Sequence, residues 1–311
     1  MAFADAVSRV WTKAGRISVS NMSLREPSQR STANRGDREP NSGLTPLSPL
    51  DTGVPSSRGA AWRQRARLRL LQMHYESRVG HLGGNLSALD LLLALFHDVM
   101  TVDDQFVLSK GHAAGALYIA LWTIGRLTDA DLQQFHRDDT RLSGHPPSRG
   151  IDDILFATGS LGHGLGLAAG LALGKRFRGR PGRVFCLTSD GEWNEGSTWE
   201  SLIFSSHQQL SNLVVIVDQN GLQGFGTTRE VADLAPLAAK LRTFGVRVLE
   251  IDGHDSRAIV SALQSGPAEG PLFIIAQTHK GCGVSFMQDR MEWHYLPLTA
   301  EQYAQAVREV S

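Results

Sequence analysis

The chain has 311 residues, 31 basic and 31 acidic side chains, and a hydrophobic fraction of 41%. This is enough for one large domain with a sizeable core. A net charge of zero argues against a protein that binds nucleic acid or an anionic membrane surface, because phosphate contacts need an excess of Lys and Arg. We also expect no membrane span, since no stretch approaches about 18 consecutive apolar residues.

Residues 1–60 are rich in Ser, Pro, Asn, Gly and Arg and show no sustained apolar periodicity. This composition predicts a disordered N-terminal extension, followed by a folded domain over 61–311. The extension lacks the apolar stretch of a secretory signal. Its basic residues Arg9, Lys13 and Arg16 leave a mitochondrial transit peptide open, and Met22 is an alternative start.

From residue 61 the apolar pattern alternates between helix and strand periods. We predict helices over 61–78, 87–98, 113–125, 163–177 and 196–209, and strands over 106–108, 183–188, 213–218, 246–250 and 272–276. This alternation indicates strand–helix–strand units, so the predicted fold class is α/β, with a mostly parallel sheet flanked by helices. Ligands of such sheets bind at the carboxyl ends of the strands.

The two cysteines are too few for a disulfide framework or a zinc site by themselves. Cys186 lies in an apolar run, where it is expected to be a small buried hydrophobe, and Cys282 is in a Gly-rich segment. Unpaired cysteines are typical of a reducing compartment, so we expect a cytoplasmic protein.

Polar turns follow two of the predicted strands, and they are one strand–helix–strand unit apart. Asp190 and Gly191 follow one strand, and Asn220 follows the next, with Leu222 two residues later. A carboxylate, an amide oxygen and a backbone carbonyl suit Mg²⁺ or Ca²⁺, and Gly191 leaves room for backbone N–H groups near a diphosphate. Either turn alone is more often an ordinary Asp-Gly or Asn-Gly turn, whereas the pair favours a metal site.

The segment Asp190-Gly191-Glu192, followed by Asp218-Gln219-Asn220, resembles the thiamine diphosphate (ThDP) motif, and further segments resemble transketolases in particular. These segments are Gly80–Gly84, Leu108–Ala113, Ser143–Pro146, Thr158–Gly164, Trp193–Glu200, Lys280–Met287 and Glu292–His294. The resemblance runs in continuous order from about residue 62 to the C-terminus, and it implies the ThDP diphosphate-binding fold.

The resemblance assigns residues to the cofactor. It implies that Asp190 and Asn220 bind Mg²⁺ through their side chains, Leu222 binds it through its carbonyl, and Ca²⁺ or Mn²⁺ could replace it. The residues that it places along the cofactor are His112 and Gly191 at the diphosphate, with Asn220 beside them, and Gly159, Ser160 and Leu161 at the two rings. Position 189 is Ser where most transketolases have Gly, so its Cβ must fit beside the diphosphate.

The resemblance also assigns residues to the reaction. His81, His145 and His294 would face the C1 and C2 oxygens of the donor ketose, which suits imidazoles because alkoxides form and disappear there near neutral pH. A lone histidine is usually structural, but each of these lies within a matching motif. Glu195 and Glu200 would lie at a subunit interface, in an acidic network that links two active sites.

Full-length transketolases have three domains, and the resemblance covers the first of them. It therefore implies the N-terminal subunit of a split transketolase, which transfers a two-carbon ketol unit from a ketose phosphate to an aldose phosphate. The partner would be a C-terminal, pyrimidine-binding subunit in an α2β2 assembly, so the chain alone should be inactive. Two alternatives stay open: another ThDP enzyme subunit, similar to 1-deoxyxylulose-phosphate synthase or to 2-oxo acid dehydrogenase E1, and an inactive binding subunit.

Overall fold

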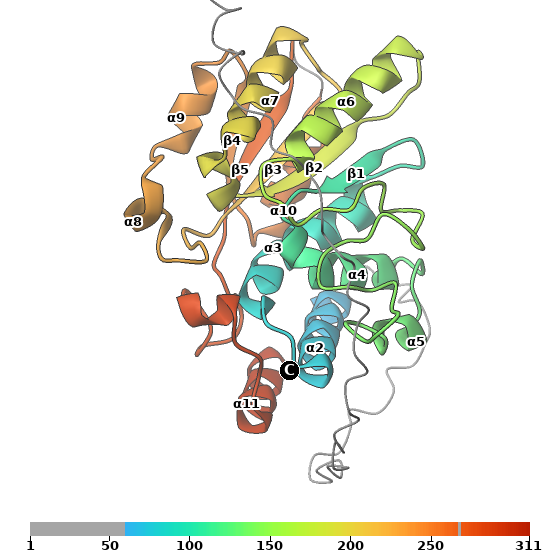
Figure 1. Ribbon diagram of the computed structural model, residues 1–311, viewed down its shortest axis with the longest axis vertical. Coiled ribbons are helices and arrows are strands. Elements are labelled where there is room, and N and C mark those ends of the chain that lie inside the picture. Colours follow the sequence, from blue (N-terminus) through green and yellow to red (C-terminus); the bar gives the residue numbers. More distant parts are fainter. Residues whose placement is uncertain (1–59, 267–268) are drawn as a thin grey trace, which may run out of the picture. The chain divides into compact units, whose positions relative to one another are not determined.

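The computed structural model describes residues 60–266 and 269–311 (Figure 1). The chain divides into two units, Met1–Leu50 and Asp51–Ser311, and every described residue belongs to the second. The predicted disordered extension lies outside the described residues, except for Ala60, where helix α2 (Ala60–Ser77) begins. The predicted boundary between extension and domain therefore stays a prediction.

The centre of the second unit is a five-stranded parallel sheet in the order β1-β2-β3-β5-β4 (Figure 1). Its strands are β1 (Gln105–Leu108), β2 (Val184–Ser189), β3 (Leu213–Gln219), β4 (Arg247–Asp252) and β5 (Leu272–Gln277). All five were predicted, and the α/β fold class is confirmed. β2 and β3 are neighbours, so the carboxyl ends that precede Asp190 and Asn220 lie at the same edge of the sheet.

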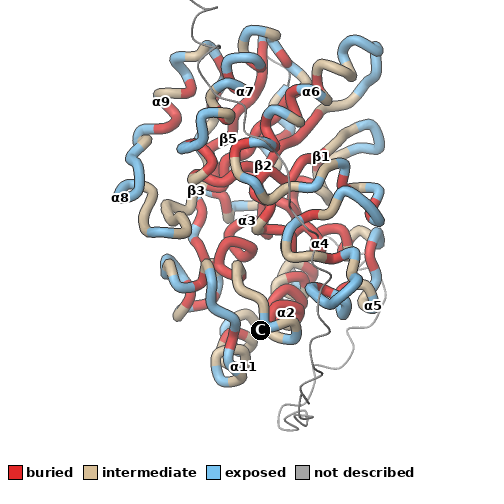
Figure 2. The backbone as a smooth tube through the Cα atoms, in the orientation of Figure 1, coloured by how far each residue is buried: buried red, intermediate tan, exposed pale blue. Residues whose placement is uncertain are grey.

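Two helical layers cover the sheet, and alternate strand residues face each of them. Phe185 and Leu187 of β2 pack in one core, whereas Val184 and Cys186 pack in the other. The helices of the first core are α2, α3 (Leu82–Ala94), α4 (Ala114–Thr123), α10 (Ser256–Leu263) and α11 (Ala300–Val310). Those of the second core are α6 (Gly164–Phe177), α7 (Gly196–His207) and α9 (Leu237–Arg242). Burial on both faces explains why β2, β3 and β5 are apolar runs, whereas the edge strand β4 is partly exposed and contains Arg247 and Glu250 (Figure 2).

Shorter elements lie between these helices and strands. They are the helices α5 (Asp129–Leu132) and α8 (Thr228–Ala232), a π-helical turn η1 (Leu95–Val99), and the 3-10 turns η2 (Gly111–Ala113), η3 (Gly191–Asn194) and η4 (Met291–His294). The elements α5, α8, α9, α10 and α11 were not predicted. The amphipathic patterns of α10 and α11 are present in the sequence and would have supported both helices.

The helix predicted over 87–98 begins five residues earlier, at Leu82. Asn85 precedes the predicted helix but lies inside α3, where its amide donates to the carbonyl oxygens of His81 and His112 and accepts from the Ala116 N–H. These bonds satisfy a buried polar side chain in a helix interior, which sequence periodicity does not show. Asn85 therefore ties the start of α3 to η2 and α4.

The stretch Leu82–Val99 has the length and mean hydropathy of a membrane-crossing helix, the only such stretch among the described residues. In the fold it is 78% buried, between α4, α2 and α10. All thirteen residues of α3 are buried, Asn85, Ser87 and Asp90 included. Its apolar composition is therefore explained by its place in the protein core.

Candidate active site

Asp190 and Asn220 meet at the carboxyl edge of the sheet, as their spacing predicts. Asp190 Oδ1 accepts the Gly191 N–H at 2.8 Å, and Oδ2 accepts the Gly221 N–H at 2.7 Å, which joins the two turns. Burial and the neighbouring charge of Asp218 raise the pKa of Asp190 to about 6. A carboxylate held this way favours a cation beside it, because a positive charge would offset both effects.

The oxygen atoms at this edge fit a hard divalent cation. Asn220 Oδ1 accepts the Leu222 N–H at 3.1 Å, so the amide oxygen and the peptide of Leu222 are held together. Asp190, Asn220 and Leu222 line the same cavity. Carboxylate, amide and carbonyl oxygens are the donor set that Mg²⁺ and Ca²⁺ prefer, so the residues present fit the predicted metal.

A buried ion pair lies beneath this edge, and the sequence did not single it out. Lys110 Nζ is 2.5 Å from Asp218 Oδ2, and both side chains are at most 1% exposed. Lys110 also donates to the Gly84 carbonyl, and Asp218 accepts from Ser87 and Thr278. Burial alone would raise the pKa of Asp218, but Lys110 and these hydrogen bonds lower it overall. The pair thus joins α3 to the carboxyl ends of β1, β3 and β5.

Glu192 holds three of the recognised segments together. Its Oε1 accepts the Gly162 N–H at 3.0 Å and the Ser109 hydroxyl, and its Oε2 accepts the Ser189 N–H at 2.9 Å. Glu192 is 1% exposed, and burial raises its pKa. The Ser189 hydroxyl lies 3.5 Å from Glu192 Oε2, and Ser189 lines the cavity.

Four histidines face one another across the cavity from this edge. The His81 ring centroid is 5.8 Å from those of His112 and His145 and 5.1 Å from that of His294. His81 has a left-handed backbone (φ 64°), and its N–H donates to the His294 carbonyl. Backbone strain of this kind at a polar cluster is typical of functional sites.

The histidines are held neutral at physiological pH. Burial lowers the pKa of His81 to about 4, with contributions from His145 and the cation of Lys280. Burial and Lys280 lower the pKa of His294 to about 3. Burial also lowers the pKa of His145, and burial with Lys110 lowers that of His112 well below its usual range. A neutral imidazole has one donor and one acceptor, so the cluster can both give and take hydrogen bonds at ligand oxygens.

Lys280 is a further site residue that sequence reasoning missed. Its Nζ lies 3.0 Å from His294 Nδ1, and burial and the like charge of Lys110 lower its pKa to about 8. Lys280 comes three residues after β5, and Lys110 two residues after β1. Their place after apolar strands is the same signal that identified Asp190, so both lysines could have been found.

A cavity of about 430 Å³ joins the edge formed by Asp190, Asn220 and Leu222, hereafter the metal edge for the cation whose donors it matches, to the four histidines. Of the predicted site residues, it is lined by His81, His112, His145, Gly159, Leu161, Asp190, Gly191, Glu195, Asn220, Leu222 and His294. Ser160 and Glu200 do not line it and are exposed, as is Glu195 at its rim. The exposed Phe225 and Tyr295 lie at its mouth, and the Tyr295 hydroxyl donates to the Gly224 carbonyl at 2.8 Å.

Comparisons with known proteins identify the family of the chain. Residues 63–310 match the family described as transketolase, thiamine diphosphate binding domain. The chain is 38% identical over 259 residues to one of the apulose-4-phosphate transketolase subunits of Phocaeicola vulgatus, covering 80% of this chain and 92% of that one. It is 38% identical over 243 residues to the 6-deoxy-6-sulfo-D-fructose transketolase subunit SqwG of a Clostridium species, covering 75% and 88%.

A solved structure has the same fold. The transketolase of Campylobacter jejuni superposes with a TM-score of 0.74 at 26% identity, over 80% of this chain and 42% of that one. The chain thus spans less than half of this transketolase, but nearly the whole of the P. vulgatus protein. The chain belongs to the transketolase family, in which it corresponds to the thiamine diphosphate binding domain.

Proposed function

We propose that the chain is the N-terminal subunit of a two-component transketolase. It binds ThDP and Mg²⁺ and, with a C-terminal partner, transfers a two-carbon ketol unit from a ketose phosphate to an aldose phosphate. The observation that carries this proposal is one cavity with the Asp190–Asn220 edge on one side and the His81, His145 and His294 cluster on the other. The first side suits a metal diphosphate, and the second suits sugar oxygens.

The metal edge would hold the cofactor by its diphosphate. Asp190, Asn220 and the Leu222 carbonyl would bind Mg²⁺, and Gly191 and His112 would contact phosphate oxygens. Lys280 adds positive charge to the cavity wall, whereas the charge of Lys110 is balanced by Asp218 beneath it. Gly159 and Leu161 line the wall along which the rings would lie, with Ser160 next to them outside the cavity lining. When bound, ThDP supplies a carbon nucleophile and an electron sink.

The histidine cluster would handle protons on the donor sugar. His81 and His145 are neutral, so each can donate a hydrogen bond to an alkoxide or accept one from a hydroxyl at C1 or C2. His294 Nδ1 accepts from Lys280, so its Nε2 carries the proton and can donate to an alkoxide. Lys280 orients His294 through the bond to Nδ1, which leaves Nε2 for the ligand. The three histidines would then bind the ligand in their neutral form, so no histidine has to gain or lose a proton before the reaction begins.

The partner would complete the site. Two relatives that this chain nearly spans are named as transketolase subunits, which supports a partner for this chain as well. An α2β2 assembly follows from analogy with dimeric transketolases, and exposed Glu195 and Glu200 are the residues we place at its interface. We also propose a cytoplasmic location, since both cysteines are free.

The test is purification of the tagged chain from its own host, with mass spectrometry of the chains that accompany it. We expect a transketolase C-terminal subunit, and ketol transfer from xylulose 5-phosphate only when both chains, ThDP and Mg²⁺ are present. Turnover by the single chain would contradict the two-component assignment. Activity of the pair with pyruvate but not with xylulose 5-phosphate would contradict the transketolase assignment.

A further inference from the structure

A short hairpin leads from the metal edge to the mouth of the cavity. Residues 222–227 form it, and Leu222 pairs with Thr227 in the antiparallel sense. Phe225, at the tip, is 88% exposed. The hairpin 222–227 therefore begins at the residue whose carbonyl is the proposed metal ligand and ends in solvent.

Gln223 holds this hairpin against the metal side of the cavity. Its amide donates to Asn194 Oδ1 at 2.6 Å. A Cβ on Gly191 would lie 3.3 Å from the Gln223 side chain, so the two are in close contact. Because Gly191 is assigned to the diphosphate, the hairpin lies beside the place where that group would bind.

Tyr295 connects the hairpin to the histidine side. It follows His294 directly, and the centroids of the two rings are 4.7 Å apart. Its hydroxyl donates to the Gly224 carbonyl at 2.8 Å. Gly80 packs so closely on the Tyr295 carbonyl oxygen that no Cβ fits there, which fixes the backbone under this side chain. One hydrogen bond thus joins the two sides of the cavity at its mouth.

Gly224 is matched in shape to this tyrosine. A Cβ on Gly224 would lie 2.7 Å from the Tyr295 hydroxyl oxygen, but 3.7 Å from both Tyr295 Cζ and His294 Nε2. Gly224 does not have a positive φ, so its backbone conformation is open to other residues. The tyrosine hydroxyl, and not the backbone, therefore requires glycine at this position.

We propose that Tyr295 is a positioning residue that retains the diphosphate cofactor, because it holds the hairpin 222–227 across the mouth of the cavity. A ligand that leaves the metal edge passes this mouth, so the Tyr295–Gly224 hydrogen bond has to break before the hairpin can move away. One neutral hydrogen bond shifts such an equilibrium by about three- to tenfold. The retained ligand is ThDP with Mg²⁺, so the inference rests on the proposed function.

The first test needs no cofactor. Hydrogen exchange of the peptide that spans residues 221–228 is measured by mass spectrometry in the full chain. Tyr295→Phe should raise its exchange rate about three- to tenfold, because the hairpin opens more often without the hydroxyl. Tyr303→Phe removes a hydroxyl from α11, outside the cavity lining, and should leave this exchange unchanged. Equal exchange in Tyr295→Phe and the unaltered chain would overturn the proposal.

The second test uses the fit between Gly224 and Tyr295. Release of radiolabelled ThDP into an excess of unlabelled ThDP is measured with Mg²⁺, on the chain with its partner. Gly224→Ala and Tyr295→Phe should each raise the release rate about three- to tenfold. The double variant should release ThDP no faster than Tyr295→Phe alone, because the added Cβ has space once the hydroxyl is gone. Additive effects of the two changes would contradict the proposed contact.

The kinetics of the assembled complex separate this role from a general loss of structure. In Tyr295→Phe the KM for ThDP should rise more than kcat falls. A fall in kcat at an unchanged KM for ThDP would count against retention of the cofactor. If the unaltered complex bound no ThDP, the proposed function would fail, whereas the hydrogen-exchange result would still decide whether Tyr295 holds the hairpin.

Discussion

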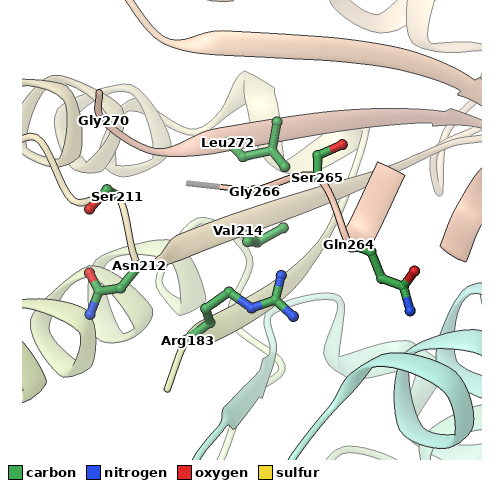
Figure 3. A pocket seen from close by; sticks show the side chains of 9 residues that line it. All are labelled: Arg183, Ser211, Asn212, Val214, Gln264, Ser265, Gly266, Gly270 and Leu272. Atoms are coloured by element: carbon green, nitrogen blue, oxygen red, sulfur yellow. The ribbon is translucent and has the colours of Figure 1, made fainter. Parts of the chain in front are cut away.

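The two edges of the sheet carry cavities of similar size and different chemistry. At the carboxyl edge, about 430 Å³ is lined by four histidines, Asp190 and Lys280. At the opposite edge, about 400 Å³ lies between the start of β2, β3 and β5 and the end of α10 (Figure 3). Volume therefore does not distinguish them.

The difference lies in what the polar side chains do. At the amino edge, Arg183 donates to the Leu263 carbonyl at 2.6 Å and lies over the Phe185 ring, and Asn212 donates to the Ala172 carbonyl. These polar side chains are therefore bonded to the backbone of neighbouring segments. At the carboxyl edge, the histidines and Asp190 have shifted pKa values and converge on shared space. Convergent titratable groups, more than cavity size, identify the site.

The largest expected effect comes from breaking the ion pair under the carboxyl edge. Lys110→Met leaves Asp218 buried without its cation, so we expect a loss of about 3–5 kcal/mol in the free energy of unfolding, measured in urea. The double variant Lys110→Met with Asp218→Asn should recover part of this loss, because no uncompensated charge remains. Equal stability of the single and double variants would show that Asp218 is not the reason for the effect.

The next effect concerns activity. Asp190→Asn keeps the shape of the metal edge but removes its charge, so we expect at least about a hundredfold loss of ThDP-dependent turnover in the assembled complex. Ser211→Ala in the amino-edge cavity is the matched control and should leave turnover unchanged. Unchanged activity of Asp190→Asn would contradict the metal assignment. A loss of turnover in Ser211→Ala would contradict the difference between the two edges.

A smaller effect should follow from weakening the hydrogen bonds that three loops donate to Glu192. Glu192→Gln keeps the volume but replaces one acceptor oxygen with an NH₂ group, which faces donors from Ser109, Gly162 or Ser189. We expect a loss of about 1–3 kcal/mol in unfolding free energy by urea titration. Glu200→Gln, on the exposed face of α7, should change it by less than about 0.5 kcal/mol. Similar values for both variants would argue against the bridging role.

The smallest effect is the pH dependence of metal binding. The pKa of Asp190, raised to about 6, means that protons compete with Mg²⁺ below that pH. Affinity of the complex for Mg²⁺ at constant ThDP, measured by calorimetry, should be constant above pH 7 and fall about tenfold per unit below 6. The free energy of unfolding changes with pH in the opposite direction to the affinity for Mg²⁺. A carboxyl whose pKa is raised from 3.8 favours the folded state at low pH, and that contribution is lost as pH rises through about 6. Affinity that is flat down to pH 4.5 would contradict the shift.

Much of the architecture was predictable because local pattern and global fold agree. The strands β1, β2, β3 and β5 are apolar runs followed by polar residues, and parallel pairing of β2 and β3 follows from the helix between them. The meeting of Asp190 and Asn220 at one edge was predictable for the same reason, since both follow those strands directly. Glycine-rich and histidine-containing segments were recognised by resemblance. The sequence did not predict the distances between these segments.

The sequence did not predict the contacts between segments that are distant in the chain. The start of α3 depends on hydrogen bonds from Asn85 to residues of two other segments, and no periodicity encodes these. Glu192 looked like an ordinary acid in a turn until three loops were seen to donate to it. The partners of Lys110 and His254 lie far away in the chain, at Asp218 and Asp90.

Local residue chemistry was therefore sufficient for the α/β class, for the parallel pairing of β2 and β3, and for the meeting of Asp190 and Asn220 at one edge of the sheet. Only the packed structure decided which charges are paired and which histidines are neutral. The physical reason is that burial and through-space charge set pKa values and reactivity, and both depend on residues that the fold brings together from far apart in the chain.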